Sequence, residues 1–356
     1  MYKILKFGGS SIKTGDRIKN IVEIVKSQNK DNCSIAIVVS AFGGITNKLI
    51  SIANNIQIPE MFFEIVKEVE QDHAHIVNEL GIKNSDNINS LFKELNSEID
   101  EIGNKKSVQI SDRIISYGER LSSQIIADYF SSVGIKSNSL DTRKVVLTDD
   151  HFGSAFVHYK ESYKKIRNYF TKVDSTQIIT GFIGATENGE TTTLGRSGSD
   201  YTASIFGAAL NAEEIQIWTD VDGILSANPK IVENAKPIQN LNYEEAMELA
   251  HAGAKVIFPP TMIPALYKNI PIWIKNTFNP KNPGSLITRE SQENNRIAVG
   301  ISSQSGMALV RLQGAGMVGL YGLIGRIFTA LAKEKINIVL VSQVFSEHSV
   351  CFVIEP

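Results

Sequence analysis

Short, nearly continuous apolar runs alternate with amphipathic segments along most of the chain. The clearest runs lie at 2–7, 35–39, 178–179 and 214–219, and shorter ones at 136–140, 145–147, 270–275 and 285–287. Such runs are typical of strands in a parallel sheet that is covered on both faces. Helical spacing begins at about residue 16 and returns at 111–130, 161–170, 201–210 and 242–250. The alternation predicts an α/β fold with a mostly parallel central sheet sandwiched by helices.

The region from about 59 to 105 departs from this alternation. It is polar and helical in period, without a glycine loop or a chemical cluster, and it predicts a helical insertion. His73 and His75 lie in this region, but residues two apart point in different directions on a helix, and no third ligand is near. We therefore expect both histidines on a solvated helix and not at a metal site.

Glycines and candidate functional side chains are concentrated at 180–203, where an apolar strand leads into a glycine-rich loop and then into a helix of small residues. Glycines allow close backbone approach, and Ser197 to Asp200 stand where helix N–H groups can meet an anion. Arg196 offers a two-pronged guanidinium for a carboxylate or phosphate, and Asp200 offers a carboxylate that can orient a cation. The competing interpretation is a glycine-rich hairpin followed by a capped surface helix.

Three further strands end in loops of small residues. Lys6 precedes Gly8 and Gly9, the second strand runs into SAFGGIT at 40–46, and Asp222-Gly223 follows a later strand. Ligands of open α/β sheets bind at the carboxyl ends of the strands, so these loops are candidates for one shared site. A lysine before two glycines is also common as a solvated strand end, so Lys6 alone does not establish the site.

Gly118 and Glu119 lie in the middle of the helical pattern at 111–130. A glycine inside a helix costs about 1 kcal/mol relative to alanine, so Gly118 is expected to make room for a neighbouring group. Glu119 beside it is the candidate carboxylate. On this segment alone, a surface helix is the simpler interpretation.

Composition narrows the classes of function. The 356 residues are long enough for two domains, and the net charge of −2 argues against nucleic acid or an anionic membrane as the main partner. No apolar stretch approaches the ~18 residues of a membrane-spanning helix. Cys33 and Cys351 lie in separate apolar runs, so we expect buried free thiols in a cytoplasmic protein, without a disulfide or zinc site.

The polar segment 288–295 lacks periodicity and is the expected linker to a second domain. Beyond it the pattern predicts strand 307–312, helix 320–333, and strands 336–341 and 350–354. The glycines of QGAGMVG at 313–319 fit the dinucleotide motif G-x-G-x-x-G. Ser342 and Gln343 stand where a ribose-binding acid is needed, so dinucleotide binding is not expected.

The motifs KFGGSS, SAFGGITN, SYGERLS, TTTLGRSGSDYTA, WTDVDGI and GAKVIFPP occur together and in this order. With them the chain resembles the aspartate kinases of the amino acid kinase superfamily, most of all the N-terminal kinase half of bifunctional aspartokinase/homoserine dehydrogenases. The resemblance implies the amino acid kinase fold at 1–290. Residues 296–356 are similar to part of an ACT regulatory domain of the α+β class.

The resemblance implies ATP-dependent phosphorylation of the β-carboxylate of L-aspartate to 4-phospho-L-aspartate, at the entry to lysine, threonine and methionine synthesis. It implies that Lys6 and Asp200 are catalytic and that aspartate is held by Thr46, Glu119, Arg196 and Ser199. ATP would be bound by Lys6, Gly8, Gly9, Ser10, Thr219, Asp220, Lys230 and Lys255. Mg²⁺ would be carried by the ATP phosphates, without a protein metal site. A carboxylate nucleophile with a pKa of ~3.9 needs no general base at neutral pH, which fits the lack of a catalytic histidine or cysteine constellation.

Some positions depart from the commonest pattern of that family. Leu225, Asn228, Lys230 and Phe258 stand where tyrosine, aspartate, arginine and histidine are common, and Ser10 stands in place of threonine. We expect these differences to affect ATP affinity more than phosphoryl transfer. Two other functions stay open: another amino acid kinase, acting on glutamate, acetylglutamate, carbamate or a nucleotide, or a catalytically weak amino-acid-sensing protein.

In the aspartate kinases, the ACT fold needs a further helix and strand beyond those expected at 307–354. The regulatory sheet is therefore expected to be incomplete, with exposed apolar strands at 339–341 and 350–353. Exposed strand edges and apolar faces pair with other chains, which predicts a homodimer through residues 306–354. Feedback inhibition by threonine or lysine, the expected effectors, should be weak or absent.

Overall fold

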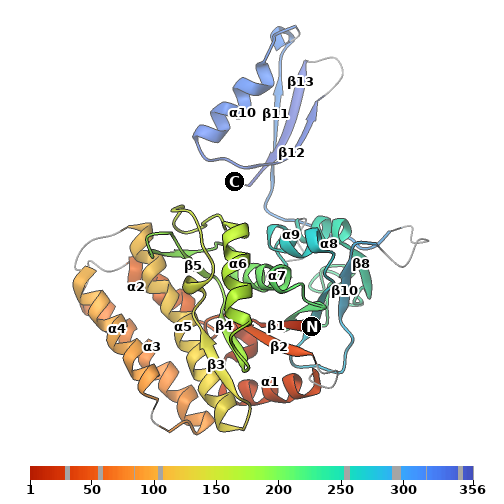
Figure 1. Ribbon diagram of the computed structural model, residues 1–356. Coiled ribbons are helices and arrows are strands. Elements are labelled where there is room, and N and C mark those ends of the chain that lie inside the picture. The colour runs from red at the N-terminus through yellow and green to blue at the C-terminus, as the bar shows by residue number, and fades with distance from the viewer. Residues whose placement is uncertain are drawn as a thin grey trace. The chain divides into compact units, whose positions relative to one another are not determined.

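The structure of the chain is a computed structural model (Figure 1). It describes residues 1–28, 33–54, 59–83, 85–102, 107–251, 257–290, 298–317, 319–343 and 348–355. The chain divides into two compact units, Met1–Ser302 and Ser303–Pro356. Much of the linker predicted at 288–295 lies outside the described residues, so the domain boundary placed there stays a prediction.

The first unit is built on an eight-stranded sheet with the order β3-β4-β2-β1-β7-β9-β10-β8. Its strands are β1 Tyr2–Phe7, β2 Ser34–Val39, β3 Ser137–Leu140, β4 Thr176–Thr180, β7 Glu214–Thr219, β8 Asn240–Asn242, β9 Ile272–Asn276 and β10 Ser285–Thr288. From β3 across to β9 each strand is parallel to its neighbour, whereas β10 is antiparallel to β9 and parallel to β8. The mostly parallel central sheet is confirmed.

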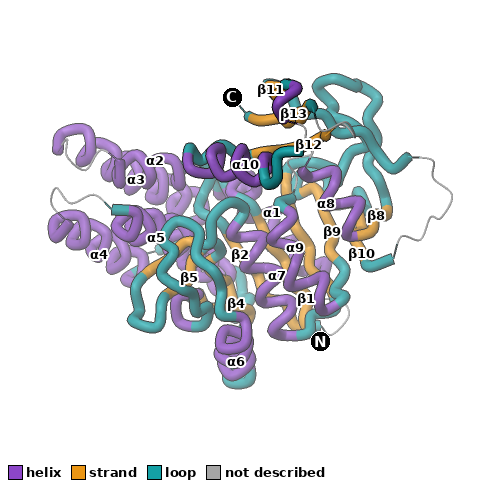
Figure 2. The backbone as a smooth tube through the Cα atoms, turned by 90° about the horizontal axis from the view of Figure 1, so that it is seen from above, coloured by secondary structure: helices purple, strands orange, loops and turns teal. Residues whose placement is uncertain are grey.

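Helices cover both faces of this sheet (Figure 2). One face carries α1 Gly15–Gln28, α2 Ile45–Asn54, α3 Pro59–Leu80, α4 Asp86–Ile102 and α5 Val108–Ser132, and the other carries α6 Tyr159–Phe170, α7 Gly198–Leu210, α8 Tyr243–His251 and α9 Pro259–Lys268. Successive strand residues point to opposite faces, so Leu5 and Phe7 enter the first core and Ile4 enters the second. The predicted sandwich of helices around the sheet is confirmed.

The predicted insertion is present as α3 and α4, but the solvated position expected for His73 is wrong. His73 is fully buried between the rings of Phe42 and Phe92, at centroid distances of 5.3 and 5.6 Å, and its Nδ1 lies 2.6 Å from Val69 O. Burial lowers the pKa of His73 to about 4, so the ring stays neutral. His75 is exposed, as expected. The insertion helices pack against the unit and form part of its core.

The short strand expected at 145–147 is absent. Residues Thr142–Lys144 form a 3-10 turn, and Leu147 makes only an isolated bridge to Ala185. Val145 and Val146 are nonetheless buried in the core beneath α6 and α7. The apolar character of residues 145–147 therefore reflects their burial in the core and not a β-strand.

Helix α5 is buried along much of its length, so the interpretation of 111–130 as a surface helix is wrong. A Cβ on Gly118 would lie 2.7 Å from Ala41 Cβ and 3.1 Å from Leu49 Cδ1. The expectation that Gly118 makes room for a neighbour is confirmed. Its missing side chain lets α5 approach the loop that follows β2.

The second unit is a small antiparallel sheet with one helix. Its elements are β11 Ala308–Gln313, the 3-10 turn Ala315–Met317, α10 Leu323–Lys333, β12 Ile338–Gln343 and β13 Ser349–Ile354, and the strand order is β11-β13-β12. Phe328 of α10 packs edge-to-face on Phe352, with ring centroids 6.4 Å apart. Val350 and Phe352 are buried in the central strand, so the exposure expected at 350–353 is wrong for them. Val339–Val341 is exposed, as expected.

Replacement of Gly118 by alanine should destabilise the protein, although alanine is the better helix former. Overpacking a close contact typically costs about 1–3 kcal/mol, which exceeds the gain of about 1 kcal/mol in helix propensity. Thermal unfolding of Gly118→Ala should show a lower Tm than the parent. Gly325→Ala in α10 is the matched control, because nothing lies within 4 Å of the added Cβ. A Gly118→Ala protein with the parent's Tm would contradict the close approach.

Candidate active site

Neighbouring parallel strands bring the glycine loops to one edge of the sheet. β4, β2, β1 and β7 lie side by side in this order, so their carboxyl ends meet. Backbone hydrogen bonds tie the loops together: Gly181 N donates to Val39 O (2.8 Å), and Gly8 N donates to Trp218 O (3.3 Å). The convergence of these loops follows the sequence prediction.

The stretch 180–203 forms a tight connection between β4 and α7. After β4 the chain makes a hairpin, β5 Ile183–Ala185 and β6 Thr191–Thr193, and then enters α7. Phe182 (φ 69°) and Ser197 (φ 55°) adopt the left-handed conformation that few non-glycine residues take. A Cβ on Gly181 would lie 2.5 Å from Ser199 Oγ, so this glycine lets the end of β4 touch the start of α7. The first turn of α7 is buried, so the alternative of a capped surface helix is wrong.

A cavity of about 650 Å³ opens at this edge of the sheet. Its lining includes the residues predicted to be catalytic or to bind substrate: Lys6, Thr46, Glu119, Arg196, Ser199 and Asp200. These residues come from β1, α2, α5, the turn before α7 and the first turn of α7. Segments far apart in the sequence therefore converge on one candidate site.

Lys6 and Asp200 form an ion pair at the floor of this site. Lys6 Nζ lies 2.6 Å from Asp200 Oδ1, and the two side chains are 11% and 9% exposed. Asp200 stands in the first turn of α7, where the positive end of the helix dipole favours a carboxylate. The pair is shielded from bulk water, so its field acts strongly on any group that enters the cavity.

Glu119 is the most unusual group in the cavity. Its Oε1 accepts a hydrogen bond from Ala41 N (3.1 Å), while its buried Oε2 has no hydrogen-bond partner within the described part of the chain. Burial raises the pKa of Glu119 to about 8. A buried carboxylate oxygen without a partner is costly, and a ligand that donates hydrogen bonds would satisfy it.

Arg196 lines the cavity from the turn before α7 and is exposed. Its guanidinium lies 5.5 Å from the centre of the Phe258 ring, and among the described residues it forms no ion pair. Ser199 Oγ accepts a hydrogen bond from Ser40 Oγ (3.0 Å), and Thr46 stands half-buried in the first turn of α2. The site therefore holds a free guanidinium fork and two hydroxyls near the buried carboxylate.

The residues predicted to bind ATP are only partly brought together. Gly8 lies beside Lys6, because a Cβ on Gly8 would be 3.5 Å from Lys6 Nζ, and Gly9 packs against Ala41 O. Ser10 follows Gly9 in the same 3-10 turn, Gly9–Ile12.

Of the ATP candidates that the structure describes, Lys6 lines the cavity, whereas Gly8, Gly9, Ser10, Thr219, Asp220 and Lys230 do not. Thr219 ends β7, next to β1, and its Oγ1 donates to Asp220 Oδ1 (3.1 Å). Lys230 lies farther along, in an exposed turn, and Lys255 falls outside the described residues. The grouping of these residues around ATP stays a prediction.

The sequence patterns assign no role to several residues that line the cavity, among them Asp112 and Phe182. Asp112 lies seven positions before Glu119, which places both on one face of a helix, and this spacing could have revealed it. Phe182 lines the cavity and has a left-handed backbone, for which the sequence carries no signal beyond the flanking glycines.

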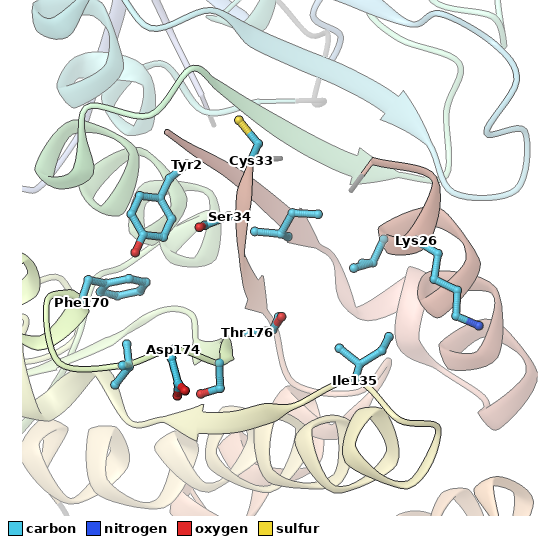
Figure 3. Close-up of a pocket in the computed structure, with 12 residues that line it drawn as sticks. Tyr2, Lys26, Cys33, Ser34, Ile135, Phe170, Asp174 and Thr176 are labelled. Carbon is cyan, nitrogen blue, oxygen red and sulfur yellow. The ribbon is translucent and has the colours of Figure 1, made fainter. Parts of the chain in front are cut away.

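A second cavity, of about 410 Å³, lies at the opposite edge, where β1, β2 and β4 begin (Figure 3). Its cysteine and its acid are already paired: Cys33 Sγ donates to Glu213 Oε2 (2.9 Å), and Asp174 lies 2.6 Å from Lys136. Within the described residues, no orphaned buried polar atom belongs to its lining. We assign no ligand to this second cavity.

Comparison with known proteins places the chain and its fold in one family. Residues 1–276 match the amino acid kinase family, and residues 310–356 match the ACT domain. The chain therefore belongs to the amino acid kinase family. Within it, the similarities lie with the aspartokinases, as the sequence motifs predict.

Two plant relatives and one solved structure illustrate this similarity. The bifunctional aspartokinase/homoserine dehydrogenase 2 of Arabidopsis thaliana is 32% identical over 99% of the chain, which covers 40% of that protein. Aspartokinase 1 of Arabidopsis thaliana is also 32% identical over 99% of the chain, which covers 63% of that relative. Aspartokinase III of Escherichia coli, solved with aspartate and ADP, superposes with a TM-score of 0.85 at 28% identity, covering 100% of the chain and 79% of that structure.

The raised pKa of Glu119 predicts a pH dependence of stability. Because the folded pKa of about 8 exceeds the unfolded value, the folded protein binds the extra proton in between, and stability should fall as pH rises from about 4.5 to 8. The limiting slope is about 1.4 kcal/mol per pH unit. Glu119→Gln removes this pH-dependent contribution. The free energy of unfolding, measured with urea at pH 5, 6.5 and 8, should therefore increasingly favour the variant over the parent as the pH rises. Parallel stability profiles of the two proteins would contradict the assignment.

Proposed function

We propose that the chain is an aspartate kinase, which transfers the γ-phosphoryl group of ATP to the β-carboxylate of L-aspartate and forms 4-phospho-L-aspartate. One observation carries the proposal: the orphaned Glu119 carboxylate, the free Arg196 guanidinium and the Lys6–Asp200 pair line a single cavity. An amino dicarboxylate carries the complementary ammonium and carboxylate groups. The similarity to an aspartokinase solved with aspartate and ADP supports this choice.

Substrate binding follows from the charges that the cavity presents. The substrate ammonium would lower the raised pKa of Glu119, so the carboxylate would ionise on binding and Oε2 would accept the hydrogen bond that it lacks in the free protein. Arg196 would hold a substrate carboxylate with both prongs of its guanidinium. The hydroxyls of Thr46 and Ser199 would complete the contacts. These residues bind and orient aspartate, and none of them needs to take a proton from its β-carboxylate.

Phosphoryl transfer then depends on charge and position. The β-carboxylate is ionised at neutral pH, so the catalytic task is to align it with the phosphoryl group and to stabilise the developing charge. Lys6 would contact the transferring phosphoryl oxygens, and Asp200 would hold Lys6 in place through the ion pair. Both act without a protein nucleophile or general base.

The residues around Lys6 fit a nucleotide triphosphate. Gly8 and Gly9 follow Lys6 after Phe7, and because they carry no side chains, phosphates could approach the loop closely. Among the described residues, no group of three acids, histidines or cysteines could hold a metal ion. Mg²⁺ would arrive with ATP and neutralise phosphate charge. Ser10, Thr219, Asp220, Lys230 and Lys255 complete the proposed ATP site.

We assign residues 1–290 to the catalytic domain, with the insertion at about 59–105, and residues 296–356 to an ACT regulatory domain. The match of 310–356 to the ACT domain supports the second assignment. None of the described helices is long and apolar enough to cross a membrane. The cytoplasmic location stays a prediction, because some relatives are chloroplastic.

Trapping of the acyl phosphate with hydroxylamine tests the proposed reaction most simply. The purified chain with ATP, Mg²⁺ and L-aspartate should form aspartyl hydroxamate, and omission of ATP should abolish it. Glutamate and acetylglutamate, run in parallel, should give at least about tenfold less product, since an added methylene or acyl group misfits a fixed site. Preferred turnover of either of these two substrates would replace aspartate kinase by another amino acid kinase.

Because Glu119 and Arg196 are proposed to bind aspartate and not ATP, their replacement should affect the KM for aspartate selectively. Glu119→Gln and Arg196→Lys should raise KM for aspartate about tenfold or more and leave KM for ATP nearly unchanged, because lysine cannot reproduce a bidentate fork. Steady-state kinetics with each substrate varied in turn provides the measurement. Lys19→Ala, an exposed lysine paired with Asp16, is the control. Equal increases in both KM values would show that these residues do not belong to the aspartate side.

We also infer that the second unit forms a homodimer. In its described strands β11 and β12 are the edges of the sheet, and Leu309 and Leu340 are 70% and 55% exposed. Burying such surface against a second copy would remove the unpaired edge and the apolar exposure.

Light scattering across a dilution series should show a dimer for the parent and a monomer for Leu340→Glu. Ile231→Glu, at an exposed position of the first unit, should remain dimeric. Threonine and lysine, the proposed effectors, should inhibit only weakly. A monomeric parent, or strong cooperative inhibition by either amino acid, would contradict this account of the second unit.

A further inference from the structure

We propose that Asp112 is a positioning residue that fixes the distance between the ammonium-binding and carboxylate-binding ends of the cavity, and thereby selects aspartate over longer amino dicarboxylates. This inference rests on the proposed function and adds the source of its selectivity. Nothing in the motifs of the chain assigns a role to Asp112.

Asp112 lines the cavity but turns its charge toward the protein backbone. It is 2% exposed. Its Oδ2 accepts hydrogen bonds from Gly153 N (2.8 Å) and Thr193 N (2.9 Å), and its Oδ1 accepts one from Thr193 Oγ1 (2.8 Å). With both oxygens engaged, Asp112 holds two loops and is not oriented to bind a ligand itself.

The two loops that Asp112 holds carry and support Arg196. Thr193 is the last residue of β6, and Arg196 lies three residues later, in the turn that leads to α7. Ala155 N donates to Thr193 O (2.9 Å), so the loop at 153–155 is bound to β6 as well as to Asp112. A Cβ on Gly195 would lie 3.1 Å from Ser154 Cβ, which shows how closely the same loop packs against the backbone before Arg196.

Helix α5 joins this anchor to the ammonium site. Asp112 and Glu119 are seven residues apart on α5, so they face the same side, about 10 Å apart along the helix axis. Glu119 faces the substrate ammonium, and Asp112 fixes the strand that leads to the guanidinium. One rigid helix therefore sets the spacing between the two recognition points.

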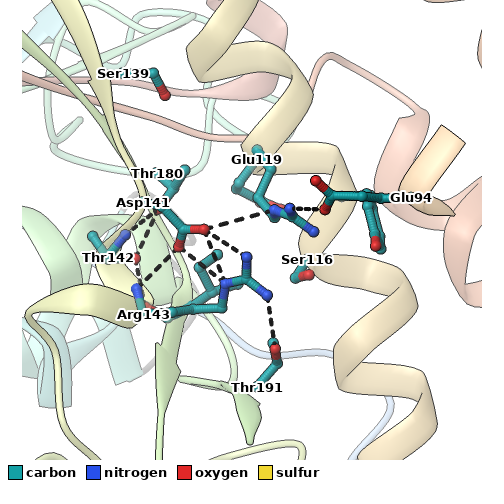
Figure 4. Close-up of polar contacts among 12 residues, drawn as sticks. Glu94, Ser116, Glu119, Ser139, Asp141, Thr142, Arg143, Thr180 and Thr191 are labelled. Atoms are coloured by element: carbon teal, nitrogen blue, oxygen red, sulfur yellow. Dashed lines mark hydrogen bonds and ion pairs between the residues drawn. The ribbon is translucent and has the colours of Figure 1, made fainter. Parts of the chain in front are cut away.

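A second brace holds the other end of β6 (Figure 4). Arg143 Nη1 donates to Thr191 Oγ1 (3.0 Å), and Arg143 is paired with Asp141 (2.6 Å). Asp141 in turn lies 3.7 Å from Arg120 Nε of α5. The start of β6 is thus held independently of Asp112, so loss of the Asp112 contacts should loosen the Arg196 end without unfolding the hairpin.

A binding site rejects a substrate with an extra methylene only if the residues that line it do not move to make room. Discrimination of one methylene is typically about 10- to 200-fold, and a shift of about 1 Å in a bound group can cost about 100-fold in rate. Glutamate is longer than aspartate by one methylene. If Arg196 could move back, the cavity would admit glutamate, so the fixed loop is what excludes it.

The test compares Asp112→Asn with Asp128→Asn in the hydroxamate assay. Asparagine keeps the size of the side chain, but its amide nitrogen cannot accept, so at least one of the three donors loses its acceptor. Asp128 is the matched control: it lies on α5, outside the cavity lining, and accepts hydrogen bonds from Ser85 Oγ (2.5 Å) and Gln124 Nε2 (2.7 Å).

Asp112→Asn should raise KM for aspartate about tenfold, leave KM for ATP unchanged and lower the aspartate-to-glutamate ratio of kcat/KM about tenfold. Asp128→Asn should match the parent in all three. Thr193→Val, which removes only the Oγ1 donor, should shift the same quantities in the same direction by less, and it replaces Asp112→Asn if that variant does not fold.

The outcomes separate this inference from the function on which it rests. A parent chain that forms no aspartyl hydroxamate overturns the proposed function, and this inference with it. An active parent with an unchanged aspartate-to-glutamate ratio in folded Asp112→Asn, or in Thr193→Val, overturns the role of Asp112 and leaves the proposed function standing. Equal changes in KM for aspartate and ATP would show a purely structural role.

Discussion

The ion pair between Lys6 and Asp200 is the interaction on which the candidate site depends. It joins the end of β1 to the first turn of α7 across a distance of 2.6 Å. For the two groups to meet, β4 must deliver its turn beside β2 and β1, and Gly181 must leave room for Ser199. The sheet order, the left-handed turn and the glycine positions thus serve one geometric requirement.

The buried carboxylate of Glu119 makes the candidate site unfavourable for the stability of the free protein. A carboxylate with one oxygen unpartnered and buried is unfavourable in the free protein, and burial raises its pKa to about 8. The fold keeps it there because Gly118 allows α5 to pack on the loop after β2, and Ala41 N supplies only one hydrogen bond. Such conflicts between local stability and chemistry are expected at functional sites.

Much of this arrangement follows from patterns that the sequence displays. Apolar runs and glycine loops predict the parallel sheet and the meeting of Lys6, Arg196 and Asp200, because parallel strands end at one edge. The burial of His73 could not be read from periodicity, since it depends on Phe42 and Phe92, which come from different segments.

Two other features also lay beyond the sequence patterns. The run at 145–147 has the apolar character of a strand, but its partners are core side chains. Asp112 carries no motif, and its role emerges only from hydrogen bonds to Gly153 and Thr193, distant in sequence. Local patterns predict elements, whereas contacts between elements decide which polar groups become functional.

A double-mutant cycle on Lys6 and Asp200 tests the central claim most directly. kcat for aspartyl hydroxamate formation would be measured for the parent, Lys6→Met, Asp200→Asn and the double variant, with circular dichroism to verify folding. The account predicts that each single change lowers kcat by about 100-fold or more, and that the double variant is little worse than the poorer single, because the pair acts as one unit. Losses that multiply, or a single variant with the parent's kcat, would contradict it.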